Sequence, residues 1–94
     1  MAWVLVRHKV EEYERWRRVF DGPGSALKGS GCKGGYVFHT EGDPNDIWVL
    51  TEFESSEAFR QFAAGHDVEK SKRDAGVIGE PEGFFLEELP KPDV

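Results

Sequence analysis

His8 is the residue of this sequence that is best placed for acid–base chemistry. It follows Val4 and Val6 and precedes Val10, in a segment where every second residue is apolar. Side chains alternate across a strand, so these four residues share one face, which we expect the helices to cover. An imidazole that faces an apolar pocket can transfer a proton or bind a ligand, and His8 is our candidate catalytic residue. The alternative is a hydrogen-bonded or solvated histidine near the end of a strand.

The two other histidines are candidates for substrate binding. His66 lies on the apolar stripe of the second predicted helix and could approach the same pocket, although a histidine at a helix end also suits the helix dipole. His39 lies near the end of a predicted strand. The length of the following turn does not fix the hairpin register, so the side that His39 faces stays open, and an edge histidine in solvent is the alternative.

Tyr13 and Trp16 are candidates for an aromatic wall against a planar ligand. With Phe20 they recur at the i, i+3 and i+7 positions of one helix face. The alternative is plain core packing, which is the more common reason for such a stripe.

Metal and cofactor sites are not indicated. The three histidines and the single cysteine lie far apart and have none of the spacings of zinc sites. Cys32 has no evident neighbouring base and is interpreted as a spare thiol. The segment 29–34 matches G-x-G-x-x-G, but it leads into a predicted strand, whereas the dinucleotide motif opens a helix. We therefore expect no bound cofactor and no metal.

The charge balance argues against two classes of partner. Eighteen acidic and twelve basic residues give a formal charge of −6, which disfavours nucleic acids and anionic membranes. One cysteine cannot form an internal disulfide, and the apolar run at residues 1–6 is too short for a signal peptide core or a membrane span. We expect a cytoplasmic protein.

The hydrophobic periodicity predicts the order β-α-β-β-α-β. The predicted strands cover residues 2–10, 34–40, 47–54 and 84–89, and the predicted helices cover residues 11–20 and 55–66. The pattern restarts at Asp67 and fades into a charged run to Asp74, and residues 75–83 are predicted to be a connecting loop. Right-handed crossovers then give a ferredoxin-like α+β fold, a four-stranded antiparallel sheet with both helices on one face. Residues 1–89 are expected to form one domain, and the proline-containing segment 90–94 a C-terminal tail.

The segment 47–53 predicts a partner because it is apolar on both faces. Trp48 and Leu50 point away from the face that the helices are expected to cover. We expect a second copy of the chain to cover them, in a homodimer whose interface includes Trp48, Leu50 and Trp3. On the same strands, Arg7 and Glu52 are expected to pair.

Residues 47–55, with the Glu52-Phe53-Glu54-Ser55 junction and the following Phe59/Phe62 helix, resemble the strand-then-helix core of the antibiotic biosynthesis monooxygenase family. The glycine-containing segment 31–36 is also similar to the family's approach to its second strand. The resemblance implies a dimeric α/β barrel, in which two sheets pack face to face and a pocket lies between sheet and helices. Activities in this superfamily include cofactor-free oxygenation of polyphenols, haem degradation, cyclisation and isomerisation, and the fold does not choose among them.

Two functions follow as expectations. The first is a small enzyme that resembles cofactor-free antibiotic biosynthesis monooxygenases and acts on an aromatic or polycyclic substrate. His8 would move a proton, and the substrate would supply electrons to oxygen. The alternative is a non-catalytic dimeric barrel that binds a ligand or is associated with stress, which the lack of a recognisable acid/base pair favours.

Overall fold

Three helices and four strands are present in the residues that the computed structural model describes, which are 2–22, 25, 27 and 29–94. In chain order they are β1 (Ala2–Val10), α1 (Tyr13–Asp21), β2 (Cys32–Thr40), β3 (Asp43–Phe53), α2 (Ser56–Ala63), α3 (His66–Ala75) and β4 (Val77–Leu86).

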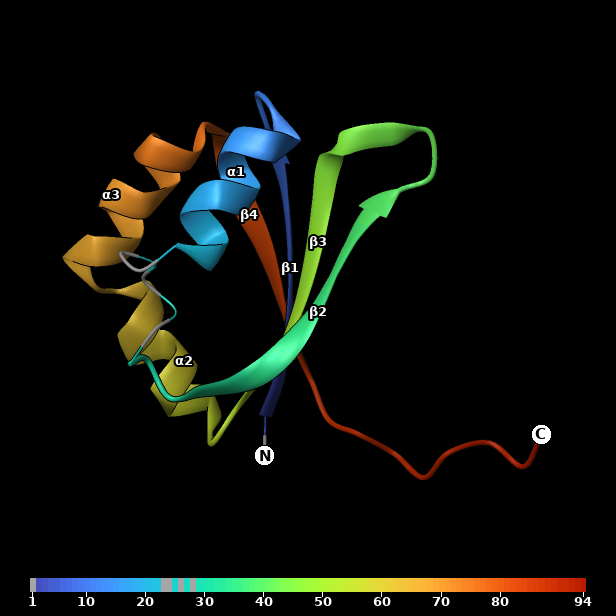
Figure 1. Cartoon of the computed structure of the whole chain (residues 1–94). Coiled ribbons are helices and arrows are strands. Elements are labelled where there is room, and N and C mark those ends of the chain that lie inside the picture. The colour runs from blue at the N-terminus through green and yellow to red at the C-terminus, as the bar shows by residue number, and fades with distance from the viewer. Residues whose placement is uncertain (1, 23–24, 26, 28) are drawn as a thin grey trace.

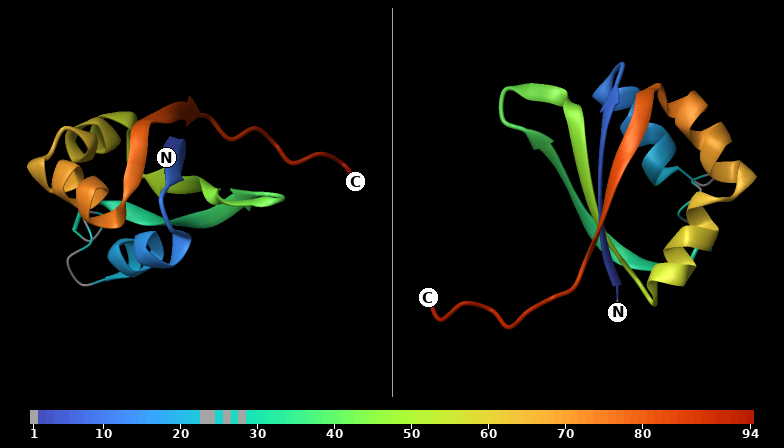
Figure 2. Two further views of the ribbon diagram at one scale, coloured as in Figure 1. Left: turned by 90° about the horizontal axis from the view of Figure 1, so that it is seen from above. Right: turned by 180° about the vertical axis from the view of Figure 1, so that it is seen from behind.

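The strands form one antiparallel sheet in the order β2-β3-β1-β4, and all the helices cover the same face of it (Figures 1 and 2). This confirms the predicted ferredoxin-like fold. Residues 87–94 extend away from the sheet as a C-terminal tail (Figure 1). None of the helices in the described ranges has the length and apolar character that crossing a membrane requires.

The helix-covered face is the one predicted from the alternation of β1. Val6 lies opposite Val49, and His8 lies opposite Ile47. The core on this face consists of buried side chains from both central strands and from the helices. Its fully or nearly fully buried members are Val4, Val10, Trp16, Ile47, Val49, Phe53 and Ala75.

The predicted loop at residues 75–83 is wrong, because most of it belongs to β4. Gly76 has a φ of 76° and ends α3, and its N–H bonds to the carbonyl of Arg73. Gly79 has a φ of 71° and lies where the β1–β4 register shifts, which indicates a bulge. Pro81 is tolerated because β4 is an edge strand, where a missing N–H costs no central ladder bond.

The charged run after Gly65 forms a separate helix, α3, which the sequence pattern did not predict. Val68, Lys72 and Ala75 are spaced at i, i+4 and i+7 and are at least half-buried. A lysine therefore occupies the middle of the inner stripe, and this is why the apolar periodicity fades in the sequence.

The β2–β3 hairpin turns at Glu41-Gly42, where Gly42 has a φ of 86°, and not over the six residues predicted. The register shifts between His39, which lies opposite Ile47, and Thr40, which lies opposite Asp43. The extra residues form a bulge on β3.

The bulge carries a polar network on the face of the sheet that the helices leave open. Asp46, only 2% exposed, accepts two bonds from Arg7, Nε to Oδ1 at 3.0 Å and Nη2 to Oδ2 at 2.9 Å. Thr40 donates to Asp46 Oδ2 at 2.6 Å and accepts from Trp48 Nε1 at 2.9 Å. Arg7 thus pairs with Asp46, and the predicted pair with Glu52 is wrong. The bonds from Arg7 and Thr40 lower the pKa of Asp46 to about 2.

Candidate functional site

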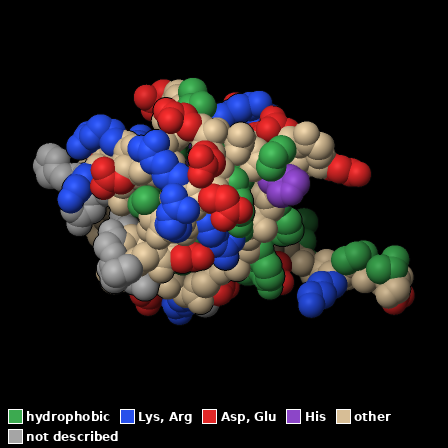
Figure 3. All heavy atoms as spheres, turned by 45° about the horizontal axis from the view of Figure 1, so that its top comes forward, with side chains coloured by type: hydrophobic (Ala, Val, Ile, Leu, Met, Phe, Trp, Pro, Cys, Tyr) green, Lys and Arg blue, Asp and Glu red, His purple; other side chains and the backbone are tan. Residues whose placement is uncertain are grey.

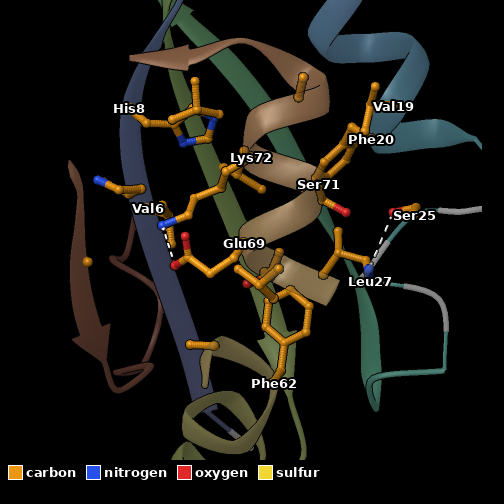
Figure 4. A pocket seen from close by; sticks show the side chains of 18 of the residues that line it. Val6, His8, Val19, Phe20, Ser25, Leu27, Phe62, Glu69, Ser71 and Lys72 are labelled. Carbon is orange, nitrogen blue, oxygen red and sulfur yellow. Dashed lines mark hydrogen bonds and ion pairs between the residues drawn. The ribbon is translucent and has the colours of Figure 1, made fainter. Parts of the chain in front are cut away.

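A cavity of about 470 Å³ lies between the helices and the sheet. Strands β1, β3 and β4 line one side and all three helices line the other (Figure 4). Most of the lining is apolar, and the volume lies within the range of roughly 300–1,000 Å³ that is usual for small-molecule sites.

His8 enters this cavity from β1 (Figure 4). Its Nδ1 and Nε2 atoms are both buried, and neither has a hydrogen-bond partner in the described part of the chain. Burial lowers the pKa of His8 from 6.5 to about 4, with the charge of Asp46 opposing this shift and that of Lys72 reinforcing it. The ring is therefore neutral near pH 7, and it presents one donor and one acceptor to whatever occupies the cavity.

Trp16 and Phe20 form one wall of the cavity. Trp16 stacks on Phe20 with ring centroids 4.7 Å apart, and it lies 5.5 Å from the His8 ring. Tyr13 packs on the other side of Trp16, at 6.1 Å, and does not line the cavity. Trp16 is therefore adjacent to His8 in the cavity wall, whereas Tyr13 contacts Trp16 and not the cavity.

The position of α1 depends on the hairpin. Glu12, at the helix start, has no side-chain cap, and the N–H of Tyr13 instead donates to Asn45 Oδ1 at 3.0 Å. Asn45 belongs to the bulged part of β3, so a residue distant in sequence caps the N-terminus of α1. This explains why α1 begins at Tyr13 and not at Glu11 as predicted.

An aromatic cluster forms the opposite end of the cavity. Phe53 packs against Phe59 at 5.3 Å and Phe62 at 5.8 Å, between ring centroids. Ser55 caps α2 by accepting from the N–H of Ala58 at 3.1 Å, as its position in the sequence predicts. The strand-then-helix segment quoted above for the family resemblance therefore builds this wall.

The remaining histidines contribute differently. His39 is exposed on the hairpin, outside the cavity, and its Nδ1 lies 2.8 Å from the carbonyl oxygen of Thr40. It lies opposite Ile47 on the neighbouring strand and shares its face of the sheet. His66 begins α3, and its side chain is outside the described residues.

Sequence reasoning missed the charged pair of the cavity, whose two residues both belong to α3. Lys72 and Glu69 enter the same cavity as His8 and form an ion pair, with Nζ and Oε1 3.0 Å apart (Figure 4). The apolar pattern fades into the charged run 67–74, so no helix was predicted there. The spacing of Val68, Lys72 and Ala75 is the signal that could have identified Lys72.

No group of three or more His, Cys, Asp or Glu side chains in the described ranges could hold a metal ion. Cys32 is a free, half-buried thiol whose Sγ lies 3.6 Å from the carbonyl oxygen of Gly34.

Comparison with known proteins gives a likeness of fold. No family model matches the sequence, and no curated protein matches it. A variant of SnoaB, a cofactor-independent oxygenase from Streptomyces nogalater, is 12% identical with a TM-score of 0.73, over 99% of this chain and 97% of that one. Two proteins assigned by name to the antibiotic biosynthesis monooxygenases are also similar. The one from Caulobacter crescentus is 16% identical, with a TM-score of 0.71 over 95% of this chain and 90% of that one. The one from Deinococcus radiodurans is 12% identical, with a TM-score of 0.71 over 100% and 98%. The predicted resemblance to this family is confirmed for the fold.

Proposed function

We propose that this chain is a monooxygenase-like enzyme that binds an aromatic or polycyclic hydroxyl compound in the helix–sheet cavity. The observation that carries the proposal is His8, whose two ring nitrogens are both unpartnered among the described residues and face an apolar, aromatic-lined cavity. Buried polar groups normally have partners, so an unpaired imidazole beside a cavity of this size suits a ligand with a polar group.

The proposed reaction needs no electrons from the protein. The apolar walls exclude water from the substrate, and His8 accepts the proton of a substrate hydroxyl. The electron-rich substrate then reacts with one molecule of oxygen. A phenol with a hydrogen on the attacked carbon would take up one oxygen atom as a quinone, and the other oxygen atom would leave as water. The substrate supplies every electron that oxygen accepts.

The proposed assembly is a homodimer through the open face of the sheet. Tyr36 and Phe38 are 59% and 53% exposed there, beside the half-buried Trp48 and Leu50. Hydrophobic side chains gather on the side of the sheet that faces the C-terminal tail, whereas charges of both signs cover the helices (Figure 3). Monomers rarely expose contiguous apolar surface of this kind, and a second sheet would cover it. The free thiol of Cys32 suits a reducing compartment, and we propose the cytoplasm.

Oxygen uptake tests the function. Purified protein is mixed with 1-naphthol, 1,2-dihydroxyanthraquinone or haem, and oxygen consumption is recorded with the visible spectrum. We expect consumption with at least one hydroxyaromatic compound and its loss in His8→Ala. The matched control is His39→Ala, because His39 is exposed outside the cavity. Equal rates in a folded His8→Ala variant would exclude the role of His8.

One observation favours a second candidate function. In the described part of the chain no carboxylate bonds to either nitrogen of His8, so an oriented acid/base pair is absent there. A non-catalytic ligand-binding or stress-associated dimer would need no such pair. Binding of the hydroxyaromatic compounds without any oxygen uptake would support this alternative.

A further inference from the structure

We propose that Lys72 is the counter-charge for an ionised hydroxyl of the ligand, so that the cavity selects acidic hydroxyl compounds, phenols and enols, and binds them as anions. The inference rests on the proposed function, because it concerns the same cavity and assigns a role to a residue of α3 that the reaction above does not use.

The first step is the position of Lys72. Its side chain is 26% exposed, enters the cavity from the inner stripe of α3, and extends toward β1 near Val6 (Figure 4). Among the described residues that line the cavity, it is the one cation. A charge in a largely apolar wall acts in a low effective dielectric, where its influence on a neighbouring titratable group is stronger than in water.

The second step is the weakness of its present partner. The carboxylate of Glu69 belongs to a side chain that is 63% exposed, three residues away on the same helix. Exposed pairs of this kind contribute little, because water solvates the acid nearly as well. The flexible stem of a lysine lets the ammonium turn from Glu69 to a ligand oxygen deeper in the cavity.

The third step is the complementarity of His8. The charges of Asp46 on β3 and Lys72 on α3 act on its ring, and Glu69 on α3 and Glu80 on β4 line the same cavity. Burial keeps its imidazole neutral, so it can donate one N–H to an oxygen anion without adding a second positive charge. An anionic oxygen would thus receive a neutral donor from the sheet and a positive charge from the helix.

The proton transfer balances without a further reactant. The O–H bond of the ligand breaks, and both electrons stay on the oxygen. The proton passes to the acceptor nitrogen of His8, and the other ring nitrogen releases its proton to water, which returns the imidazole to its neutral form with an N–H toward the ligand oxygen.

A bound dye tests the proposal directly. The visible spectrum of 1,2-dihydroxyanthraquinone differs between its neutral and ionised forms, so a pH titration under nitrogen reports the apparent pKa of the bound hydroxyl. We expect this pKa to be lower on the wild type than on Lys72→Met by about one pH unit, the smaller end of the effect of a close opposite charge. Lys70→Met, which removes an exposed lysine of the same helix, should behave like the wild type.

A second variant keeps Lys72 and therefore serves if Lys72→Met does not fold. Glu69→Gln releases the ammonium from its partner, and we expect the pKa of the bound hydroxyl to fall below the wild-type value. Equal pKa values on wild type and Lys72→Met, or an unchanged or higher pKa on Glu69→Gln, would overturn the role of Lys72 while leaving the proposed function intact. If neither this dye nor 1-naphthol binds to the wild type, the proposed function fails first and this inference falls with it.

Discussion

The ring of Trp16 lies 5.5 Å from the ring of His8, at an interplanar angle of 51°. Trp16 is itself only 3% exposed and is stacked on Phe20, so it shields the imidazole without offering it a hydrogen-bond partner. This pairing of helix and strand explains why His8 is desolvated and neutral in a cavity that could otherwise have held water. The protonation state of His8 therefore depends on the packing of α1.

The first prediction concerns the pH dependence of stability. The pKa of His8 is about 4 in the folded chain and 6.5 when exposed, so the unfolded chain binds more protons between these values. The free energy of unfolding should therefore fall as the pH decreases from 6.5 to 4, by up to roughly 3 kcal/mol, and this contribution should not change further below pH 4. Urea unfolding at a series of pH values measures it.

The control for this prediction is His8→Gln, which keeps a polar side chain but cannot titrate. Its unfolding free energy should vary less between pH 6.5 and pH 4 than that of the wild type. Identical pH profiles for the two proteins would show that His8 is solvated in the folded state.

The second prediction concerns the network of Arg7, Asp46 and Thr40. The pKa of Asp46 is lowered from 3.8 to about 2, so its carboxylate stabilises the fold above pH 3.8, and this stabilisation is lost as the pH falls through 2. Asp46→Asn should lower the melting temperature at pH 7 and should make Trp48 fluorescence more sensitive to quenchers, because an amide has one acceptor oxygen and cannot accept all the bonds that Arg7 and Thr40 donate to the carboxylate. Asp43→Asn is the control, since Asp43 forms an exposed pair with Lys9 that should contribute about 0–1 kcal/mol. Equal effects of the two substitutions would contradict the prediction.

Sequence reasoning predicted the parts of the fold in which one local pattern acts alone. The alternation of β1 and β3 gave their faces correctly, and Ser55 gave the start of α2. It failed where a polar residue occupies a buried position. Lys72 replaces an apolar residue on the inner stripe of α3, so the helix and its cavity residue were both overlooked.

The remaining errors have a different cause, because they depend on partners distant in sequence. The local sequence of residues 75–83 is typical of a loop. Most of this segment forms a strand because it pairs with β1, with a bulge at Gly79. The register of His39 and the cap that Asn45 gives to α1 both depend on the bulge of β3. No short segment contains this information.

The third prediction concerns the close approach of β2 and β3 at Gly35. A Cβ at this position would collide with the carbonyl oxygen of Leu50, which is backbone and cannot turn away. Gly35→Ala should lower the free energy of unfolding by about 1–3 kcal/mol, as for other overpacked sites. Gly83→Ala is the matched control in β4, because a Cβ there meets nothing within 4 Å, and its effect should stay within about 0.5–1 kcal/mol. Chemical denaturation measures the free energy of unfolding of the two variants. Equal values would mean that β2 can shift away from β3 without loss of stability.

The fourth prediction tests the proposed homodimer. Phe38 is 53% exposed on β2, directly opposite Trp48 on β3, and Leu5, Phe84 and Leu50 continue the apolar surface across the open face. A lysine at position 38 would place a charge in the middle of a sheet-to-sheet contact, where burial without a partner is costly. Phe38→Lys should therefore raise the dimer dissociation constant at least about tenfold, which corresponds to 1.4 kcal/mol.

Sedimentation velocity over a range of concentrations measures this change. Gln61→Lys is the control, because Gln61 is exposed on α2, which covers the other face of the sheet, and its substitution should leave association unchanged. Near-ultraviolet circular dichroism shows whether each variant keeps its fold, since an unfolded protein would also fail to associate. A wild-type chain that sediments as a folded monomer at micromolar concentration would leave the open face without its proposed cover. The same result for Phe38→Lys alone, with a dimeric wild type, would place Phe38 at the centre of the contact between the two sheets.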